Sequence, residues 1–371
     1  MKDSRNKIPN WIKVILSSVI SILILVHFEF LYSLFSYVSN DEIIKQGGFW
    51  TLFSLIFSSP IAFAIWCFRD RNATDQINNA RKDTNLKEYH KIVEWITSND
   101  SSEELKISAI YSLRRFYEDE SLGFQQAALH LLLVTWESMQ KKELARLEKV
   151  NDPKKAKSII KSLRRNGNSP LGIAITSVLL ANDGKCILAY PEVFPGICLA
   201  GMNFYLPGLS DDIVNNLFNN KRIKFSGVKL QGCQFKFINL KNIDFSNSNL
   251  QGTEWGEIND TSKVSVWNDI DFCKCNFSYS TFNEIKVKNC NFSDGKFMNA
   301  KFYKCDIDDS TRFINVTLFG SSLSFTSLPK NKNFLASVVG EEDLSNWEYK
   351  AKKTYTIEEV KERGITVFSV M

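Results

Sequence analysis

Two long apolar runs lie near the start of the chain. Residues 14–35 are almost wholly apolar, broken by small serines and two ionisable side chains, and residues 49–68 carry no charge. About 20 helical residues, each rising ~1.5 Å, cross the ~30 Å hydrocarbon layer of a bilayer. With the short polar loop 39–48 between them, the runs predict a two-helix transmembrane hairpin. A cleaved signal peptide fits poorly, because the first run is too long and a second follows at once.

The two ionisable side chains in the first run are His27 and Glu29, which form a candidate intramembrane polar site. An acid within a span is costly, so by default it is a functional hypothesis. Glu29, however, lies in the last third of the run, near the outer interface. An interfacial or hairpin-packing role is therefore the competing interpretation.

Basic residues flank the predicted hairpin on its two outer sides. The loop holds one lysine beside two acids, whereas eight basic residues stand outside the runs: Lys2, Arg5, Lys7, Lys13, Arg69, Arg71, Arg81 and Lys82. The positive-inside rule then places both termini in the cytoplasm. The expected localisation is the bacterial inner (plasma) membrane, in a multi-pass form, with membrane lipid as a partner.

The next hundred residues are predicted to form an α-helical cytoplasmic region. Apolar residues recur at mostly helical spacing over 105–117, and a second helix is expected over 124–139. Asp100 or Ser101 is the expected cap of the first helix.

The end of this region is strongly basic. Residues 140–165 hold ten lysine or arginine side chains against three acids, a balance of +7 that exceeds the +5 of the whole chain. Three interpretations stay open: a solvated helix face with a linker, contact with anionic lipid headgroups, and contact with nucleic acid. Nucleic acid is disfavoured, because no aromatic residues are interleaved to stack on bases.

Large apolar residues recur every five positions over the C-terminal half. The register shifts by two residues between Trp255 and Phe272 and by one residue before Phe313, and a smaller or branched residue stands two positions before each centre. Neither the period of an α-helix nor that of a β-strand explains a strict repeat of five residues. Twelve centres define the expected solenoid core: Phe225, Leu230, Phe235, Leu240, Phe245, Leu250, Phe272, Phe277, Phe282, Phe292, Phe297 and Phe302.

A period of five fits a square coil in which each pentapeptide forms one side and points two side chains inward. Each coil buries its apolar side chains only against the next coil. The segments NSNLQG, CQFKF, CNFSYSTF and CNFSDGKFMNAKF resemble the pentapeptide-repeat family, written A(D/N)LXX. The resemblance implies an all-β, right-handed quadrilateral β-helix. The stretch SEELKISAIYSLRRFYEDES is similar to the helical segment of bacterial, membrane-anchored members that carry an N-terminal transmembrane hairpin.

The predicted chain has five parts, and the last of them is a small cap or docking tail. A capping box at Thr356 and Glu359 opens a short helix there, ending near Gly364. The parts are the transmembrane hairpin (1–70), the helical region with its basic linker (71–170), a helix or turn leading into the solenoid (171–195), the pentapeptide-repeat β-helix (196–329) and the C-terminal cap (330–371).

Composition argues against catalysis. The chain has only three histidines, and it shows no Walker loop, dinucleotide-binding fingerprint, zinc spacing or nucleophile elbow. Cys233, Cys275, Cys290 and Cys305 occupy the small inward position, where cysteine acts as a compact apolar residue. We therefore expect no enzyme activity, catalytic residue, cofactor or metal.

Three functions remain as hypotheses. The first is a membrane-anchored scaffold that presents the repeat surface to a cytoplasmic protein partner. The second is a membrane-perturbing effector, for example in antiphage defence, whose hairpin forms a homo-oligomer when triggered through the repeats. The third, taken from the family, is a topoisomerase-inhibiting DNA mimic. This needs an acidic surface, whereas residues 221–328 hold 14 basic and 11 acidic residues.

Overall fold

The computed structural model describes residues 10–38, 48–210, 212–256, 264–329, 333–349 and 353–369. The chain divides into two compact units, Met1–Lys87 and Glu88–Met371. Three sequence predictions fall at least partly outside the described residues. They concern the polar loop between the apolar runs, the N-terminal basic residues Lys2, Arg5 and Lys7, and the insertion that follows Trp255.

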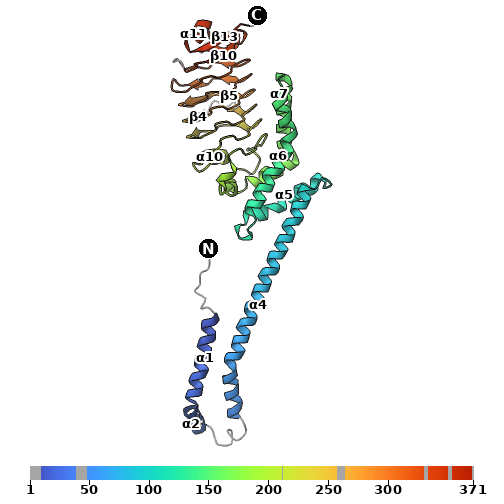
Figure 1. Ribbon diagram of the computed structural model, residues 1–371, viewed down its shortest axis with the longest axis vertical. Coiled ribbons are helices and arrows are strands. Elements are labelled where there is room, and N and C mark those ends of the chain that lie inside the picture. Colours follow the sequence, from blue (N-terminus) through green and yellow to red (C-terminus); the bar gives the residue numbers. More distant parts are fainter. Residues whose placement is uncertain are drawn as a thin grey trace. The chain divides into compact units, whose positions relative to one another are not determined.

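The first unit is helical. It holds α1 (Asn10–Val26), α2 (Phe28–Val38) and the beginning of α4 (Gly48–Thr97), all visible in Figure 1. The first apolar run is thus divided at His27, whose N–H donates to the Leu23 carbonyl over 3.0 Å and closes α1. Glu29 lies in the first turn of α2, where a carboxylate interacts favourably with the positive end of the helix dipole.

The sequence predicted that the two apolar runs near the start of the chain have the length and composition of membrane-spanning helices. Among the described residues no single helix satisfies both criteria. One bent pair, Pro170–Leu179 with Asn182–Leu188, satisfies them together, and its apolar side chains are largely buried in the core of the second unit.

The second unit begins with helices. Ser102 caps α5, accepting a hydrogen bond from the Leu105 N–H, so the predicted cap was wrong by one or two residues. The predicted second helix is longer than expected and continues through half of the basic segment. Asp152 then caps the next helix and Pro153 opens it. The helices are α5 (Glu103–Glu118), α6 (Gln125–Lys149), α7 (Pro153–Gly167), α8 (Pro170–Leu179) and α9 (Lys185–Leu188), with 3-10 turns at Glu120–Leu122, Asn182–Gly184 and Pro191–Val193.

The C-terminal half is a stack of coils whose strands pair in parallel (Figure 1). One sheet has the order β1-β3-β5-β7-β9 and another the order β2-β4-β6-β8. Phe282 pairs with Phe302, twenty residues on, as a four-sided coil of pentapeptides requires. The strands are β1 (Gln234–Phe235), β2 (Leu240–Lys241), β3 (Glu254–Trp255), β4 (Ser265–Asn268), β5 (Thr281–Asn283), β6 (Ile285–Lys288), β7 (Lys301–Tyr303), β8 (Asp306–Ile307) and β9 (Ser322–Ser324).

The insertion after Trp255 differs from its prediction. Leu240 pairs with Trp267, which is fully buried and is the next centre after Trp255. The step between these two tryptophans is therefore twelve residues, and the paired positions are 27 residues apart instead of twenty, whereas the predicted shift of register was two residues.

Aromatic rings stack from coil to coil in the core. One column contains Phe225, Phe245, Phe272, Phe292, Phe313 and Phe334, with successive ring centroids 4.7 to 5.4 Å apart. Phe218 of α10 (Ile213–Phe218), an insertion between the first coils, packs against Phe225 and Phe235. The interior is filled by side chains.

The smaller inward residues satisfy backbone carbonyl groups. The Ser248 hydroxyl donates to the Phe225 carbonyl over 2.9 Å, and the Cys275 thiol donates to the Phe245 carbonyl over 3.0 Å. A small side chain with a donor therefore fits this position better than a large apolar one. The same contact explains why serine, threonine and cysteine share one column.

The C-terminal segment closes the stack. Its β13 (Ile365–Phe368) pairs in parallel with β10 (Ser337–Gly340), and the predicted capping box at Thr356 and Glu359 opens α11 (Ile357–Glu362). Phe334 continues the column of stacked rings. The remaining elements are the 3-10 helix η4 (Glu341–Asn346) and the antiparallel pair β11 (Glu348–Tyr349) and β12 (Lys353–Thr354).

Candidate interaction surface

The residues singled out from the sequence fall into two groups. The twelve core centres are all buried. His27 stands between α1 and α2, two residues before Glu29, and both are exposed. In the part of the chain that the structure describes, no group of three or more His, Cys, Asp or Glu side chains is placed to hold a metal ion.

The inward cysteines are poor nucleophiles. Burial raises the pKa of each of the Cys233, Cys290 and Cys305 thiols to about 12. Because the thiolate is the reactive form, these thiols are inert at neutral pH. Cys273 is partly exposed at a corner while Cys275 is buried, so the C-x-C pair points to opposite sides of the coil wall.

One corner of the solenoid forms a continuous strip. Six residues stack along it, each with a positive φ between 56° and 75°: Gly201, Gly232, Gly252, Tyr279, Asn299 and Gly320. The N–H of Gly201 donates to the Gln231 carbonyl of the next coil, and the pattern repeats from Gly252 to Ser278 and from Asn299 to Phe319. We call these six residues the corner strip.

Helix α7 covers the lower part of the corner strip. A Cβ atom on Gly201 would lie 2.4 Å from the Leu163 carbonyl oxygen, and one on Gly252 would lie 2.5 Å from the Ile160 side chain. Glycine is therefore required there by close approach as well as by φ. Side chains larger than hydrogen appear at Tyr279 and Asn299, in the coils above.

Arg164 fixes α7 to two coils at once. Its guanidinium donates to the carbonyls of Gly232 and Gly252, each over 2.8 Å, and to the Glu254 carboxylate over 2.6 Å. On the other side of the strip, Lys229 pairs with Glu137 of α6 over 2.8 Å, and this hydrogen bond raises the pKa of Lys229. The hairpin of α6 and α7 is thus held by apolar contact along the strip and by charge on both sides.

The tip of this hairpin lies near Tyr279. Val150 and Tyr279 are partly buried against the small core that the hairpin shares with the solenoid. Partial burial raises the pKa of Tyr279, and the nearby Asp152 carboxylate raises it further. The covered part of the strip therefore ends at this coil.

Three apolar side chains continue the strip beyond the hairpin. Met298 is 40% exposed, Phe319 is 36% exposed and Phe368 of β13 is 50% exposed. The rings of Phe319 and Phe368 are in contact, with centroids 6.2 Å apart. We call Met298, Phe319 and Phe368 the upper corner patch.

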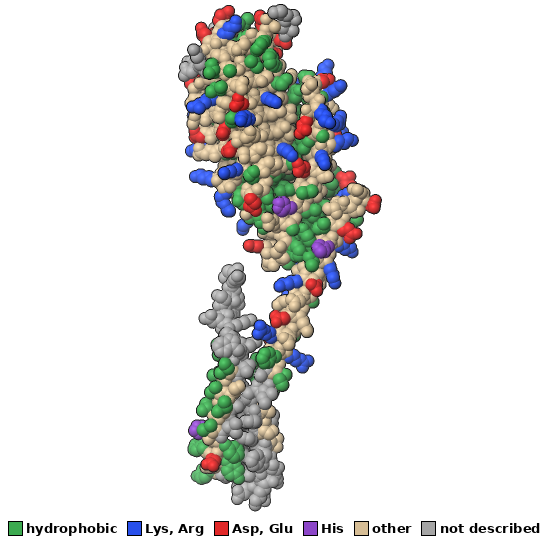
Figure 2. All heavy atoms as spheres, in the orientation of Figure 1, with side chains coloured by type: hydrophobic (Ala, Val, Ile, Leu, Met, Phe, Trp, Pro, Cys, Tyr) green, Lys and Arg blue, Asp and Glu red, His purple; other side chains and the backbone are tan. Residues whose placement is uncertain are grey.

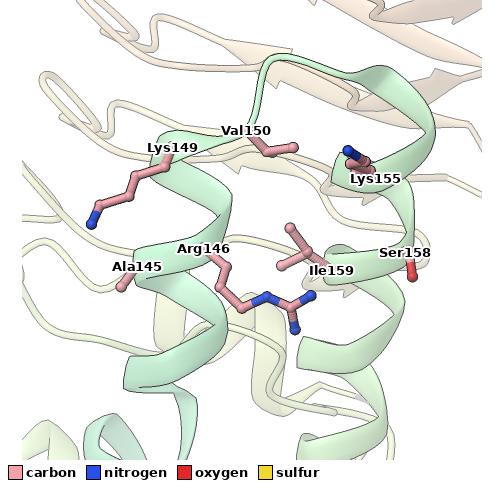
Figure 3. Close-up of a pocket in the computed structure, with 7 residues that line it drawn as sticks. All are labelled: Ala145, Arg146, Lys149, Val150, Lys155, Ser158 and Ile159. Atoms are coloured by element: carbon pink, nitrogen blue, oxygen red, sulfur yellow. The ribbon is translucent and has the colours of Figure 1, made fainter.

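The basic residues gather on the outer side of the hairpin, as the blue side chains in Figure 2 show. A groove of about 410 Å³ lies between the two helices near their tip, and its lining residues appear in Figure 3: Ala145, Arg146, Lys149, Val150, Lys155, Ser158 and Ile159. Arg146 points toward α7, while Lys149 points away. The Arg146 guanidinium is already paired with Glu143 over 2.9 Å. The basic segment is thus two helices docked on the solenoid instead of a linker.

Sequence reasoning missed this docking, although a signal was present. Glycine recurs at the same corner in three successive coils and is then replaced by Tyr279. Glycine repeated at an outward corner marks a close approach of another segment. The partner segment is far away in sequence, so periodicity alone does not identify it.

The comparisons with known proteins agree with the repeat architecture. The family model for pentapeptide repeats matches residues 223–254. A search of curated proteins finds no match to this chain. Among solved structures, the chain is similar to HetL, a pentapeptide repeat protein involved in heterocyst differentiation regulation from the cyanobacterium Nostoc sp. strain PCC 7120, at 12% identity over 43% of this chain and 62% of HetL, with a TM-score of 0.27.

Two further solved structures are similar to this chain. Rfr23 from the cyanobacterium Cyanothece 51142 matches at 13% identity over 30% of this chain and 64% of Rfr23, with a TM-score of 0.15. QnrB1, a plasmid-mediated fluoroquinolone resistance protein, matches at 15% identity over 38% of this chain and 87% of QnrB1, with a TM-score of 0.16. The chain spans less than two thirds of the HetL and Rfr23 chains. The matched repeats and the stacked coils together support a pentapeptide-repeat solenoid in this chain.

Proposed function

We propose that the chain is a membrane-anchored, non-enzymatic scaffold that presents its solenoid to a protein partner at the cytoplasmic face of a bacterial inner membrane. The proposed anchor is the hairpin of the apolar runs 14–35 and 49–68. Basic residues on both outer sides of the runs support cytoplasmic termini. A fluorescent protein fused to the C-terminus of the full chain tests the anchor. Fluorescence that stays in the membrane fraction after carbonate extraction supports it, and fluorescence in the soluble fraction overturns it.

The observation that carries the scaffold proposal is the upper corner patch. Its three exposed apolar side chains stand on a wall whose inner side is filled by stacked rings, so the patch is presented in one fixed arrangement. Contiguous apolar groups on an otherwise polar surface mark interaction sites. A preorganised patch also binds with a smaller loss of conformational entropy.

Crosslinking capture of the tagged full-length protein from native membranes tests this proposal. We expect one stoichiometric protein partner with the unaltered chain and its loss with Phe319→Ser. The matched control is Ile314→Ser, which removes an apolar side chain of nearly the same exposure, 37% against 36% for Phe319, from a different corner. Capture that is equal for both variants, or that brings down only copies of this chain, would count against the scaffold proposal.

A second candidate function is the membrane-perturbing effector, favoured by one observation in the first unit. The apolar run is divided at His27, and a carboxylate at Glu29 opens the following helix. Such a break offers a point at which the hairpin rearranges when the repeats bind a trigger. The effector function would be supported if cells that express the chain stop growing when it is triggered and Glu29→Ala abolishes this arrest. It would be excluded if expression of the chain has no effect on growth under phage challenge.

A further inference from the structure

Beyond the hairpin tip, the corner strip repeats the arrangement that holds α7 nearer its start, and no α-helix among the described residues lies on this part. Below, the strip is flanked by Lys229 on one side and Glu254 on the other, and both charges are paired with residues of the hairpin. Ile160 and Leu163 pack on the strip between them. The lower half is therefore a complete docking site for an amphipathic helix with charged edges.

The parallel ladders identify the equivalent positions above. Lys229 is followed in its column by Asn249, Asn276 and Lys296. Glu254 is followed in its column by Thr281 and Lys301. Lys296 and Lys301 thus flank Met298, at the lower end of the upper corner patch, on the same two sides. Both are exposed, and among the described residues neither takes part in an ion pair.

We infer that the upper corner patch, with Lys296 and Lys301 at its edges, docks an amphipathic helix with acidic edges that belongs to the protein partner. This inference rests on the proposed scaffold function and names the kind of partner. The helix lies along the strip as α7 does below it. Its apolar side covers Met298, Phe319 and Phe368, and its Asp or Glu side chains pair with the two lysines.

The charge around the patch gives the docked helix a direction. Lys154 and Lys155 at the hairpin tip border the lower end, whereas Glu341 and Glu342 of η4 follow Gly340, whose rung lies between those of Phe319 and Phe368. Acidic residues are therefore favoured near the tip and disfavoured near η4. The patch extends over four coils, which are ~4.8 Å apart, so it spans ~14 Å. A helix rising ~1.5 Å per residue covers that length with about ten residues.

The test places the photocrosslinking amino acid benzoylphenylalanine at position 319 of the full chain, in native membranes. We expect the crosslinked peptide to come from a different protein and to have apolar residues at helical spacing with Asp or Glu beside them. Lys296→Glu combined with Lys301→Glu should lower the crosslink yield about tenfold, as expected when complementary charges become repulsive. The matched control is Lys286→Glu with Lys288→Glu on exposed positions of β6, which should leave the yield unchanged.

Several outcomes would overturn the inference. They are a crosslink to a second copy of this chain, a crosslink to a segment with basic edges, and a yield that the change at Lys296 and Lys301 leaves intact. Equal thermal midpoints for the two double variants show that both are folded. If a partner is captured but never crosslinks from position 319, the inference fails while the scaffold function stands. If no partner is captured at all, the scaffold function fails first.

Discussion

Replacing Arg164 by alanine should release α7 from the solenoid. The guanidinium makes hydrogen bonds to two backbone carbonyls and one carboxylate, and the side chain is only 21% exposed. Hydrogen bonds to charged groups contribute about 1.5–3 kcal/mol each, but because Arg164 is partly exposed, water replaces part of the lost donor. The Glu254 carboxylate is 40% exposed, so its ion pair adds about 0–1 kcal/mol. We expect a loss of about 2–3 kcal/mol in the free energy that holds α7 in place.

Hydrogen exchange of the α7 amides measures this loss directly. At about 1.4 kcal/mol for each factor of ten, protection of residues 153–167 should fall about 30- to 150-fold. Arg165→Ala is the matched control, because Arg165 is exposed on the same helix. Arg164→Lys should fall between the two, since an ammonium keeps the charge but lacks the fork of donors. Equal protection in Arg164→Ala and Arg165→Ala would refute the reasoning that these bonds fix the helix.

Three further predictions concern the coils. Phe272→Ala removes a ring from the middle of the stacked column and should cost about 3–5 kcal/mol, measured by urea unfolding, while Phe272→Leu should cost less because leucine refills part of the cavity; equal costs would contradict this packing argument. Gly252→Ala should lower the thermal midpoint of unfolding more than Gly227→Ala. Both glycines have a positive φ, but only a Cβ atom at position 252 would clash with Ile160; the reverse order of midpoints would contradict the close approach of α7. Burial raises the pKa of Cys305 to about 12, above the ~8.5 of an unfolded thiol, so the unfolded chain loses its proton first as pH rises. The free energy of unfolding should therefore fall from pH 8.5 toward 12, and Cys305→Ala should reduce that fall; an identical fall in both proteins would contradict the assignment.

The repeat region was predictable because its signal is local. Each centre from Phe272 to Phe302 packs against a residue about twenty positions away, at the equivalent place in the next coil. A large apolar residue at every fifth position is therefore enough to determine the coil. The same rule missed Trp267, which pairs with Leu240 across 27 residues instead of twenty. Regular spacing predicts a structure only where the chain itself is regular.

The docked hairpin was not predictable in the same way. Arg164 and Glu254 are 90 residues apart, and nothing in the basic segment distinguishes a helix that packs on the solenoid from one that faces solvent. In the sequence, the exposed Phe319 likewise cannot be distinguished from any other residue that follows a core centre. Its significance comes from the hairpin that covers the strip below it, which only the structure shows.

The C-terminal cap has a consequence for self-association. A stack of parallel rungs presents unpaired N–H and C=O groups at each end, and such an edge is a template on which further copies can add. Here β13 pairs with β10, and the antiparallel pair β11 and β12 and helix α11 complete the final rung. At the other end, the first coil shares one continuous apolar core with α5, α6 and α8. Because non-repeat segments cover both ends of the stack, we expect end-to-end growth of filaments to be disfavoured and self-association of the solenoid to use its sides.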